Sequence, residues 1–562
     1  MIVEFKYKGQ SAVTQGLDGA RMTFASNTVR EAAYFRGTLG RPLVLREALG
    51  VLHQVVTSDL KFHPRDRFAF EEWLAEQDRI FLAKLAMRRE DARVRVEELE
   101  SRRVALDEAR DKRLAPYYAQ RRQYFEYVWK NQYELNYLFD PVISIHPDEI
   151  FFEAFSKDES SYARVGARYD LFERIHEFEC GTTNIDFSGK LAGEFDRMRT
   201  YRKTDLDVTA SGFGVRVGDA PEHREKKIDL PESWVKGFLQ VQSTMTMGLT
   251  RVRMASIDLF NLLRVLKRRK ARTSPRAMRY ELVPGQPVKV VFEPWEHAVV
   301  LSAASIYQGP KAQIVRTWGR DRLRVLGRLL PQAHGVDVYL AGLGLPSIYV
   351  VNLGEVSFTL ALSGWTDNDW TGGAKFDLLT RRLNATAEEL LLVYETMGKK
   401  VHGTDVELSQ LTKLGVEKTR SVLSHLCQVG RAIFDLSTGK YRRRDLFLAP
   451  FTLKDAAKAV KPAATETTKE AQGAQVIFAQ ENVRIIARRP YSLGFKLSGS
   501  AKGGDGARVR PLLTVNHDGD IVEGTCTCSF FRSHQLTKGP CEHLLALRLA
   551  HMDRLAAEDK KS

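Results

Sequence analysis

The chain has 562 residues, which is more than one hydrophobic core holds and corresponds to about three or four domains. Apolar residues make up 43% and charged residues 28% of the chain, a composition that excludes a disordered or fibrous protein. The formal charge of +15, from 85 basic and 70 acidic residues, favours polyanionic partners, but over so long a chain it identifies none.

Hydropathy and cysteine content indicate a soluble protein of a reducing compartment. The first residues, 1–8, alternate like a strand and lack the long apolar segment of a signal peptide. The most apolar long run, Val336 to Leu353, contains Asp337 and Pro346, which favours two strands and a turn over a membrane helix. Three of the five cysteines lie within sixteen positions, which favours metal-bound thiolates over disulfides. We therefore expect a cytoplasmic protein without membrane contact.

The first 138 residues predict two regions of different character. Residues 1–63 mix short strand-like runs with an apolar helical stretch at Leu43 to Leu60. Residues 64–138 are densely charged, and their apolar residues recur at spacings of three, four and seven, with a break at Pro116. This pattern predicts a long helical hairpin or arm. It is either a solvated helix pair packed on its own domain or a coiled coil that binds a partner.

Residues 139–380 form the largest region and predict a mixed α+β domain without a repeat of fixed period. Strands are expected at Val288–Phe292, Ala298–Leu301, Val336–Leu340, Ile348–Leu353 and Val356–Leu362. A basic helix is expected at Leu259–Arg272. The pattern of this region indicates neither its fold nor its role.

Residues 384–450 predict a winged helix-turn-helix-like domain. Either Asn384 or Thr386 is placed to cap its first helix. The expected elements are helices at Ala387–Met397, Asp405–Leu414 and Val416–Val429, and a hairpin at 431–447 with its turn at 437–440. Three helices with a tight turn between the second and third, followed by a hairpin, is the order of a winged helix.

Basic residues mark two segments as candidate nucleic-acid contacts. In the predicted winged helix they are Lys418 and Arg420 on the third helix and Lys440, Arg442, Arg443 and Arg444 on the wing. In the predicted basic helix they are Lys267, Arg268, Arg269 and Lys270. A basic wing along the phosphates with a polar helix in the groove binds DNA, but many winged helices contact proteins instead. The basic helix is either a phosphate-binding stripe or a solvated helix end.

The C-terminal part predicts a linker followed by a β-rich domain. Residues 452–475 are rich in Ala, Lys, Thr and Glu and are expected to form the linker. In the last domain, residues 476–562, strands are expected at Val476–Phe478, Val483–Ala487, Leu493–Leu497, Arg510–Val515 and Asp520–Gly524.

Three cysteines and one histidine in this last domain have the spacing of a zinc site. Cys526 and Cys528 are separated by one residue, as are Cys541 and His543, with twelve residues between the pairs. Structural zinc takes four tetrahedral thiolate and imidazole ligands, and residues two apart on a strand share a face. The second pair converges only if Cys541 precedes the following helix, as the Gly-Pro sequence before it predicts. Four protein ligands leave no position for water, so we expect one structural, non-catalytic Zn²⁺ ion.

Basic residues close to these ligands extend the set of candidate phosphate contacts. Arg532 and Lys538 lie between the two ligand pairs. There they are placed to offset the negative charge of three thiolates and to leave a basic surface for phosphates.

This ligand pattern, after strands and before an apolar helix, resembles the SWIM zinc finger over residues 510–550. The four metal ligands of that family correspond to Cys526, Cys528, Cys541 and His543. The upstream segments 140–153, 181–188 and 223–231 are similar to a group of large bacterial SWIM-containing proteins. The resemblance implies a module that binds DNA or proteins. The bacterial group resembles components encoded beside MoxR-type AAA ATPases and von Willebrand A-domain proteins, which implies an adaptor for that system.

Enzyme signatures are scarce. The sequence has no phosphate loop ending in Gly-Lys-Ser/Thr, no His-Glu-x-x-His and no Gly-x-Ser-x-Gly. The acidic run Asp148, Glu149, Glu153, Asp158 and Glu159 fits either a cation site or a solvated surface. We expect a zinc-binding, non-enzymatic scaffold that binds DNA, proteins or both. The alternatives are a pure protein adaptor of the ATPase system and, third, an enzyme with an active site in residues 139–380.

Overall fold

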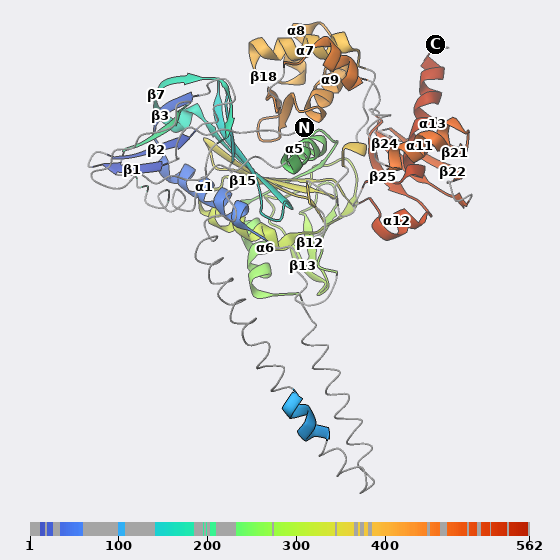
Figure 1. The fold of residues 1–562 in the computed structure, drawn as a ribbon, viewed down its shortest axis with the longest axis horizontal. Coiled ribbons are helices and arrows are strands. Elements are labelled where there is room, and N and C mark those ends of the chain that lie inside the picture. The colour runs from blue at the N-terminus through green and yellow to red at the C-terminus, as the bar shows by residue number, and fades with distance from the viewer. Residues whose placement is uncertain are drawn as a thin grey trace. The chain divides into compact units, whose positions relative to one another are not determined.

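The structure is a computed structural model (Figure 1). It describes residues 12–16, 19–25, 34–59, 99–106, 141–184, 195, 198, 200, 203–209, 232–271, 275–342, 345–364, 369–370, 376–379, 385–446, 450–460, 469–491, 494–502, 507–516, 519–536 and 539–559. Contacts divide the chain into two units: Lys61–Leu138, and Met1–Leu60 with Phe139–Ser562. In the first unit residues 99–106 are helical. The rest of the expected arm, and the segment 223–231, lie outside the described residues.

The larger unit is built on an eight-stranded antiparallel sheet of order β10-β15-β16-β17-β6-β5-β4-β8. Its strands are β4 Val142–Ile145, β5 Glu149–Phe155, β6 Ser161–Arg168, β8 Gly181–Asn184, β10 Thr250–Met254, β15 Gly335–Leu340, β16 Ser347–Asn352 and β17 Val356–Leu362. The three strands predicted between 336 and 362 are confirmed. Every residue of β5 is buried, so this strand is covered on both faces.

The sheet consists of two similar halves that meet at the β6–β17 pair. Each half contains a three-stranded antiparallel meander, β4–β6 in one and β15–β17 in the other. Each meander is preceded in the chain by a strand that leads directly into a helix: β3 (Tyr34–Leu39) and α1 (Pro42–Thr57) before the first, and β10 and α6 (Ser256–Arg268) before the second. Strand β10 lies in the same sheet, whereas β3 pairs with β7 and β9 in a separate sheet.

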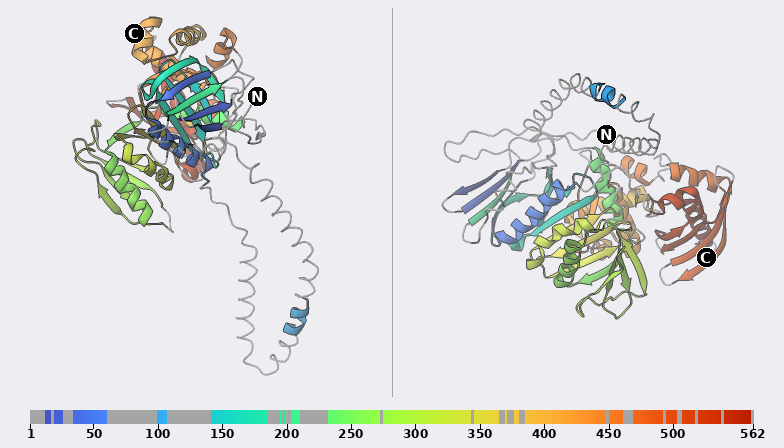
Figure 2. Two further views of the ribbon diagram at one scale, coloured as in Figure 1. Left: turned by 90° about the vertical axis from the view of Figure 1, so that its left-hand side faces the viewer. Right: turned by 90° about the horizontal axis from the view of Figure 1, so that it is seen from below.

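Helix α1 covers part of this sheet and contacts β5, β6 and β17 (Figure 2). Leu45, Leu49, Leu52 and Val56 are buried, and their spacing of three and four places them on one face of the helix. Helix α6 ends at Arg268, four residues before the predicted end. Its last buried apolar residue is Leu266, so no core contact supports a further turn.

Two smaller sheets and several short helices complete this part of the chain. One sheet has the order β1-β2-β9-β3-β7 and the other β13-β12-β11-β14. The additional strands are β1 Ala12–Gly16, β2 Gly19–Ala25, β7 Phe172–Glu179, β9 Lys203–Thr209, β11 Met278–Leu282, β12 Lys289–Phe292, β13 His297–Val300 and β14 Gln313–Thr317. The helices are α5 Glu232–Met245 and the 3-10 turns η1 Tyr169–Leu171, η2 Arg320–Arg328, η3 Leu330–Gln332 and η4 Phe376–Leu378. The predicted strands at 288–292 and 298–301 correspond to β12 and β13.

Residues 385–446 contain three helices and a hairpin in the predicted order. The elements are α7 Ala387–Lys400, β18 His402–Gly403, α8 Asp405–Thr412, α9 Val416–Gln428, β19 Ala432–Asp435 and β20 Lys440–Arg443, with sheet order β18-β20-β19. Thr386 caps α7: its hydroxyl accepts from the Glu389 amide at 3.2 Å, and the Glu389 carboxylate accepts from the Thr386 amide at 2.8 Å. This reciprocal pair satisfies two amides that the helix itself leaves unbonded.

The C-terminal region differs from the prediction at its start. Its helices are α10 Leu453–Val460, α11 Lys469–Ala479, α12 Ser529–His534 and α13 Glu542–Asp559, and its strands are β21 Val483–Tyr491, β22 Gly494–Lys502, β23 Arg508–Val509, β24 Leu512–Asn516 and β25 Ile521–Thr525. The predicted strand at Val476–Phe478 is wrong, because these residues lie in α11. Ala474 and Ile477, three residues apart, bury one face of α11, which contacts α13.

The segment expected as a linker, 452–475, also holds regular structure. It contains α10 and the first part of α11. Ala456 of α10 is buried in the core of the three-helix region, and α10 contacts α7. Small alanine side chains allow this close packing, whereas the sequence pattern indicates only the lack of large apolar residues. Among the described helices, none combines the length and the apolar character that crossing a membrane requires.

Candidate metal centre and cationic surfaces

The four predicted zinc ligands come together in the structure. Cys526 directly follows β25, Cys528 directly precedes α12, and Cys541 directly precedes α13, whose first turn holds His543. One ligand atom from each residue lies within 4.8 Å of all the others, and all four residues are buried. Three sulfurs and one imidazole at this spacing match the donor set of a structural zinc site.

The local backbone explains how these ligands converge. The Cys528 sulfur accepts from the Phe531 amide at 3.4 Å and so caps α12, a short helix that the sequence did not predict. Gly539 has a φ of 92°, a conformation that glycine adopts without strain. The chain therefore turns before α13, and Cys541 precedes the helix as predicted. Neither ring nitrogen of the buried His543 has a hydrogen-bond partner. A metal ion would satisfy one of them, so the residues present fit the ion.

The three thiols strongly influence one another. A hydrogen bond from Cys541 lowers the pKa of Cys526 to about 4, while that same bond raises the pKa of Cys541. Burial raises the pKa of Cys528. Without a cation only one sulfur is therefore readily ionised. A divalent ion at the centre would stabilise all three thiolates, and its binding would release the protons of Cys528 and Cys541.

Comparison with known families identifies this module. Residues 508–551 match the family model of the SWIM zinc finger. The SWIM zinc finger of this chain comprises β23 to β25, α12 and the first half of α13, and its Cys3His cluster holds one structural Zn²⁺ ion. The predicted ligand set is confirmed.

Comparisons of the whole chain are less informative. A comparison with curated proteins gives no match. Among solved structures, proliferating cellular nuclear antigen from Entamoeba histolytica matches with 12% identity and a TM-score of 0.30, covering 41% of this chain and 90% of that one. The A. fulgidus antigen bound to the C-terminal region of FEN-1 matches with 11% identity and a TM-score of 0.28, covering 41% and 91%. At these TM-scores neither likeness supports an inference.

Two of the predicted wing contacts, Arg442 and Arg444, are buried and form ion pairs. The Arg442 guanidinium, which is 0% exposed, lies 2.7 Å from Asp148 and 3.1 Å from Glu149. Arg444 donates to Glu153 at 2.7 Å. These carboxylates lie on β5 or directly before it. In this conformation neither arginine can reach a phosphate, so their burial argues against the predicted nucleic-acid contact.

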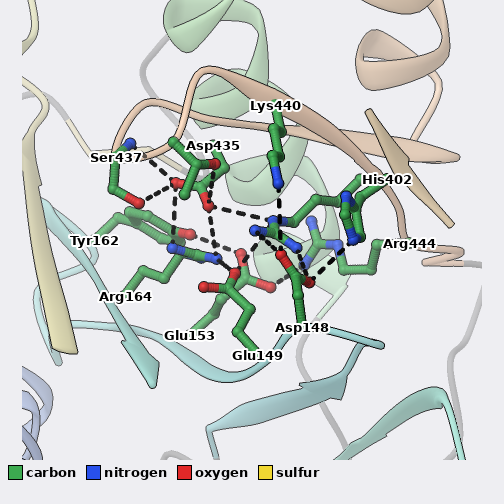
Figure 3. Close-up of polar contacts among 12 residues, drawn as sticks. Asp148, Glu149, Glu153, Tyr162, Arg164, His402, Asp435, Ser437, Lys440 and Arg444 are labelled. Carbon is green, nitrogen blue, oxygen red and sulfur yellow. Dashed lines mark hydrogen bonds and ion pairs between the residues drawn. The ribbon is translucent and has the colours of Figure 1, made fainter. Parts of the chain in front are cut away.

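Arg164 of β6 joins this buried network from the sheet side (Figure 3). Its guanidinium pairs with Glu149 and lies 3.2 Å from Asp435, which precedes the turn of the hairpin β19–β20. Burial alone would raise the pKa of Asp435, but Arg164 and Arg442 hold it well below its usual range. Burial raises the pKa of Glu149 despite its arginine neighbours. The network thus fixes the hairpin β19–β20 to the eight-stranded sheet.

Most carboxylates of the acidic run that was considered as a cation site already have partners within the chain. Asp148, Glu149 and Glu153 each pair with an arginine. Asp158 accepts from the hydroxyls of Ser156 and Ser160, both at 2.6 Å. Carboxylates that already have these partners are poorly placed to ligate a hard cation, which removes the support for a cation-dependent enzyme there.

The remaining predicted contacts lie nearer the surface. Lys440 is 3.9 Å from Asp148, Arg443 3.2 Å from Asp445, Lys418 3.1 Å from Glu389 and Arg420 2.7 Å from Asp405. Lys267, Arg268, Arg269 and Lys270 are exposed at the end of α6, and Arg532 is exposed on α12. Lys538 lies outside the described residues. Of these predicted contacts that the structure describes, only the α6 residues and Arg532 have no carboxylate partner among the described residues.

A further cationic surface was not predicted from the sequence. It consists of the exposed side chains Arg484, Arg489, Lys496, Lys502 and Arg508, which we call the basic sheet face. Strand register places them together: Arg484 pairs with Ser500, Arg489 with Lys496 and Arg508 with Lys502. Directly paired residues share one face of an antiparallel sheet. The other face packs on α13, as the contact of Gly499 and Gly524 with Leu547 and Leu544 indicates.

The basic sheet face is almost free of compensating acid. No ion pair or hydrogen bond joins its five cations to a carboxylate in the part of the chain that the structure describes. Glu523, which pairs with Thr514, is the one carboxylate at an outward position of the described strands β21–β25. The sequence signal for this face is the alternation in β22, where Lys496 and Lys502 flank Ser498 and Ser500 while Leu497 and Ala501 are buried.

Proposed function

We propose that this protein is a non-catalytic scaffold that binds nucleic acid through the basic sheet face of its zinc-held C-terminal module. The observation that carries this proposal is the exposure of five cations on one sheet face without ion-pair partners among the described residues. Cations held this way lose little by exchanging water for phosphate, and the counterions released from the nucleic acid drive binding.

Because the basic sheet face consists of lysine and arginine side chains, we expect it to contact the phosphate backbone of the nucleic acid and not the edges of the bases. Five phosphate contacts on duplex DNA would give a slope of about −4.5 for log affinity against log salt. Lysine and arginine contacts to phosphates position a protein but read no sequence. We therefore expect steep salt dependence and weak sequence preference.

Zinc has a structural role in this proposal. Four protein ligands complete a tetrahedral site and leave no position for a reacting water. The ion ties the end of β25 to the start of α13, and α13 packs on the inner face of the same sheet. By fixing this packing the metal keeps the outer face of the sheet exposed.

The winged-helix-like region has a different role. Because Arg442 and Arg444 pair with the β5 side, its hairpin is a docking element of the scaffold and not a wing that follows phosphates. This assignment keeps the predicted architecture of three helices and a hairpin but moves the nucleic-acid contact to the C-terminal module.

A salt-dependent titration of the full-length chain with a labelled DNA duplex tests the proposal. We expect binding at low salt that the double charge reversal Lys496→Glu/Lys502→Glu removes. A control, Lys399→Glu/Lys454→Glu, makes the same change of charge at exposed positions of α7 and α10 and should bind as the wild type does. Absence of wild-type binding at low salt, or equal loss in both variants, would refute it.

A second candidate is a pure protein adaptor, which two exposed apolar side chains favour. Ile486 is 67% and Leu512 is 51% exposed, and both lie among the cations of the basic sheet face. An acidic protein segment with apolar anchors would fit this mixture. A MoxR-type AAA ATPase or a von Willebrand A-domain protein is the partner class that the sequence resemblance implies. In that case the wild type should bind no DNA even at low salt, and Ile486→Ser/Leu512→Ser should abolish capture of that partner.

A further inference from the structure

A pocket lies between helix α6 and the edge strand β13, far in sequence from the zinc module. Its volume is about 420 Å³, within the range of small-molecule sites. From α6 it is lined by Asn261, Arg264, Val265, Arg268 and Arg269, and from β13 by His297 and Val299. The wall residues of β13 are two apart and so share one face of the strand.

Helical spacing brings the arginines to one side of α6. Asn261, Arg264 and Arg268 lie at positions i, i+3 and i+7, a single stripe of the helix surface. The opposite stripe, formed by Leu259, Leu262 and Leu266, is buried in the core. The packing of α6 on the core therefore fixes which face of the helix borders the pocket. It also holds the backbone that carries these arginines in place.

These arginines differ from their neighbours in having no acidic partner. Nearby arginines are paired: Arg279 with Glu296 at 2.7 Å, Arg316 with Glu293 at 2.9 Å, Arg324 with Asp321 at 2.9 Å and Arg328 with Glu47. Among the described residues Arg264 and Arg268 have no hydrogen bond or ion pair, and Arg269 contacts only the ring of Trp295, 6.0 Å away. Three guanidinium groups thus line one pocket, and no carboxylate of the described chain pairs with them.

The helix dipole does not explain this arrangement. The dipole of α6 favours cations in the last turn of the helix, which accounts for Lys267 and Arg268. Arg264 lies one turn earlier, and a histidine on a separate strand gains nothing from the dipole of α6. Planar guanidinium groups bind oxyanions with paired hydrogen bonds, and Asn261 and His297 add further hydrogen-bonding groups to the pocket.

We infer that the α6–β13 pocket binds a phosphate-bearing ligand through Arg264, Arg268 and Arg269. The phosphate belongs either to a small phosphorylated molecule that fills the pocket or to a nucleic-acid backbone that crosses it. The apolar walls at Val265 and Val299 accommodate the part of the ligand that carries the phosphate. This site lies outside the SWIM zinc finger and does not depend on the basic sheet face.

The test compares two double variants of α6 with the same change of charge. Arg264→Ala/Arg268→Ala removes pocket cations, and Lys267→Ala/Lys270→Ala removes cations of the same segment that do not line the pocket. Binding of inorganic pyrophosphate and of a short labelled DNA duplex is measured for the full-length protein. We expect the arginine pair to lose at least about tenfold in affinity and the lysine pair to stay within about twofold.

The two probes identify the source of the phosphate. Loss of pyrophosphate affinity assigns the pocket to a small ligand, and loss of DNA affinity alone assigns it to a nucleic-acid backbone. In a second variant, Asn261→Glu, a carboxylate is placed three residues before Arg264, where it pairs internally and should weaken binding without lowering the melting temperature. Equal behaviour of the arginine and lysine pairs with both probes, or no binding of either probe to the wild type, would overturn the inference.

Discussion

The hairpin β19–β20 and the sheet β21–β24 both carry several arginines and lysines, but the two regions use these cations differently. In the hairpin, Arg442 and Arg444 are fully or almost fully buried against the carboxylates of the β5 side. In the sheet, Lys496 and Lys502 are exposed and have no partner among the described residues. A basic segment is therefore available to a polyanion only where no other part of the chain supplies the anion.

The comparison also separates two ways of stabilising a domain. The hairpin is held by paired charges that would each be costly to bury alone. The sheet is held by apolar packing on α13 and by the metal centre. Disturbing one region should therefore leave the other intact, which the following variants test.

The largest effect is expected from loss of a metal ligand. Cys541→Ala should reduce the zinc content from about one ion per chain to almost none, since structural zinc contributes about 10–16 kcal/mol to such modules. Hydrogen exchange should then show opening of residues 508–551 and no change in the hairpin β19–β20. Elemental analysis checks the metal content, and Cys180→Ser, which replaces a half-exposed cysteine outside the cluster, is the control. A variant that keeps its zinc would contradict this assignment of Cys541.

The second largest effect is expected in the hairpin β19–β20, where the stability should fall. Arg442→Ala leaves Asp148, Glu149 and Asp435 without their shared cation and should lower the free energy of opening of the hairpin by about 3–5 kcal/mol. Lys440→Ala, two residues away and 3.9 Å from Asp148, should cost about 0–1 kcal/mol. Hydrogen exchange of the β19 and β20 amides measures both values. Similar values for the two variants would mean that the buried network does not hold the hairpin.

The pH dependence of the hairpin should identify Asp435 as an ionised partner. Because its pKa is depressed in the folded protein, its stabilising effect is present above the usual carboxyl pKa and is lost as the pH falls below it. The free energy of opening should fall by up to about 1.4 kcal/mol per pH unit in that range. Asp435→Asn should remove this part of the slope. Burial and the charge of Asp435 both raise the pKa of Glu149, so in the variant the pKa of Glu149 should fall as well. Identical pH profiles would contradict the assignment.

The sequence predicted those features that depend on neighbours along the chain. The four zinc ligands lie within eighteen positions, and their spacing, with the glycine and proline before Cys541, was sufficient. The cap at Thr386 and the order of helices and hairpin in 385–446 depend on equally local patterns. The helix α11 was missed because its alanines become a buried face only once α13 is present.

Long-range contacts could not be predicted in this way. Arg442 and Asp148 are 294 positions apart, and nothing local marks them as partners. The basic sheet face requires the register of β21 with β22, including the irregularity between Ile485 and Ala487, and knowledge of which face α13 covers. The two halves of the large sheet are likewise visible only in the pairing of β6 with β17.

The salt dependence of DNA binding tests most directly whether the sheet, and not the hairpin, contacts phosphate. The slope of log affinity against log salt is measured for the wild type, for Lys496→Ala/Lys502→Ala in the sheet and for Lys440→Ala/Arg443→Ala in the hairpin. We predict that the sheet pair reduces the magnitude of the slope by about 1.8 and that the hairpin pair leaves it unchanged. A reduction confined to the hairpin pair would contradict the account.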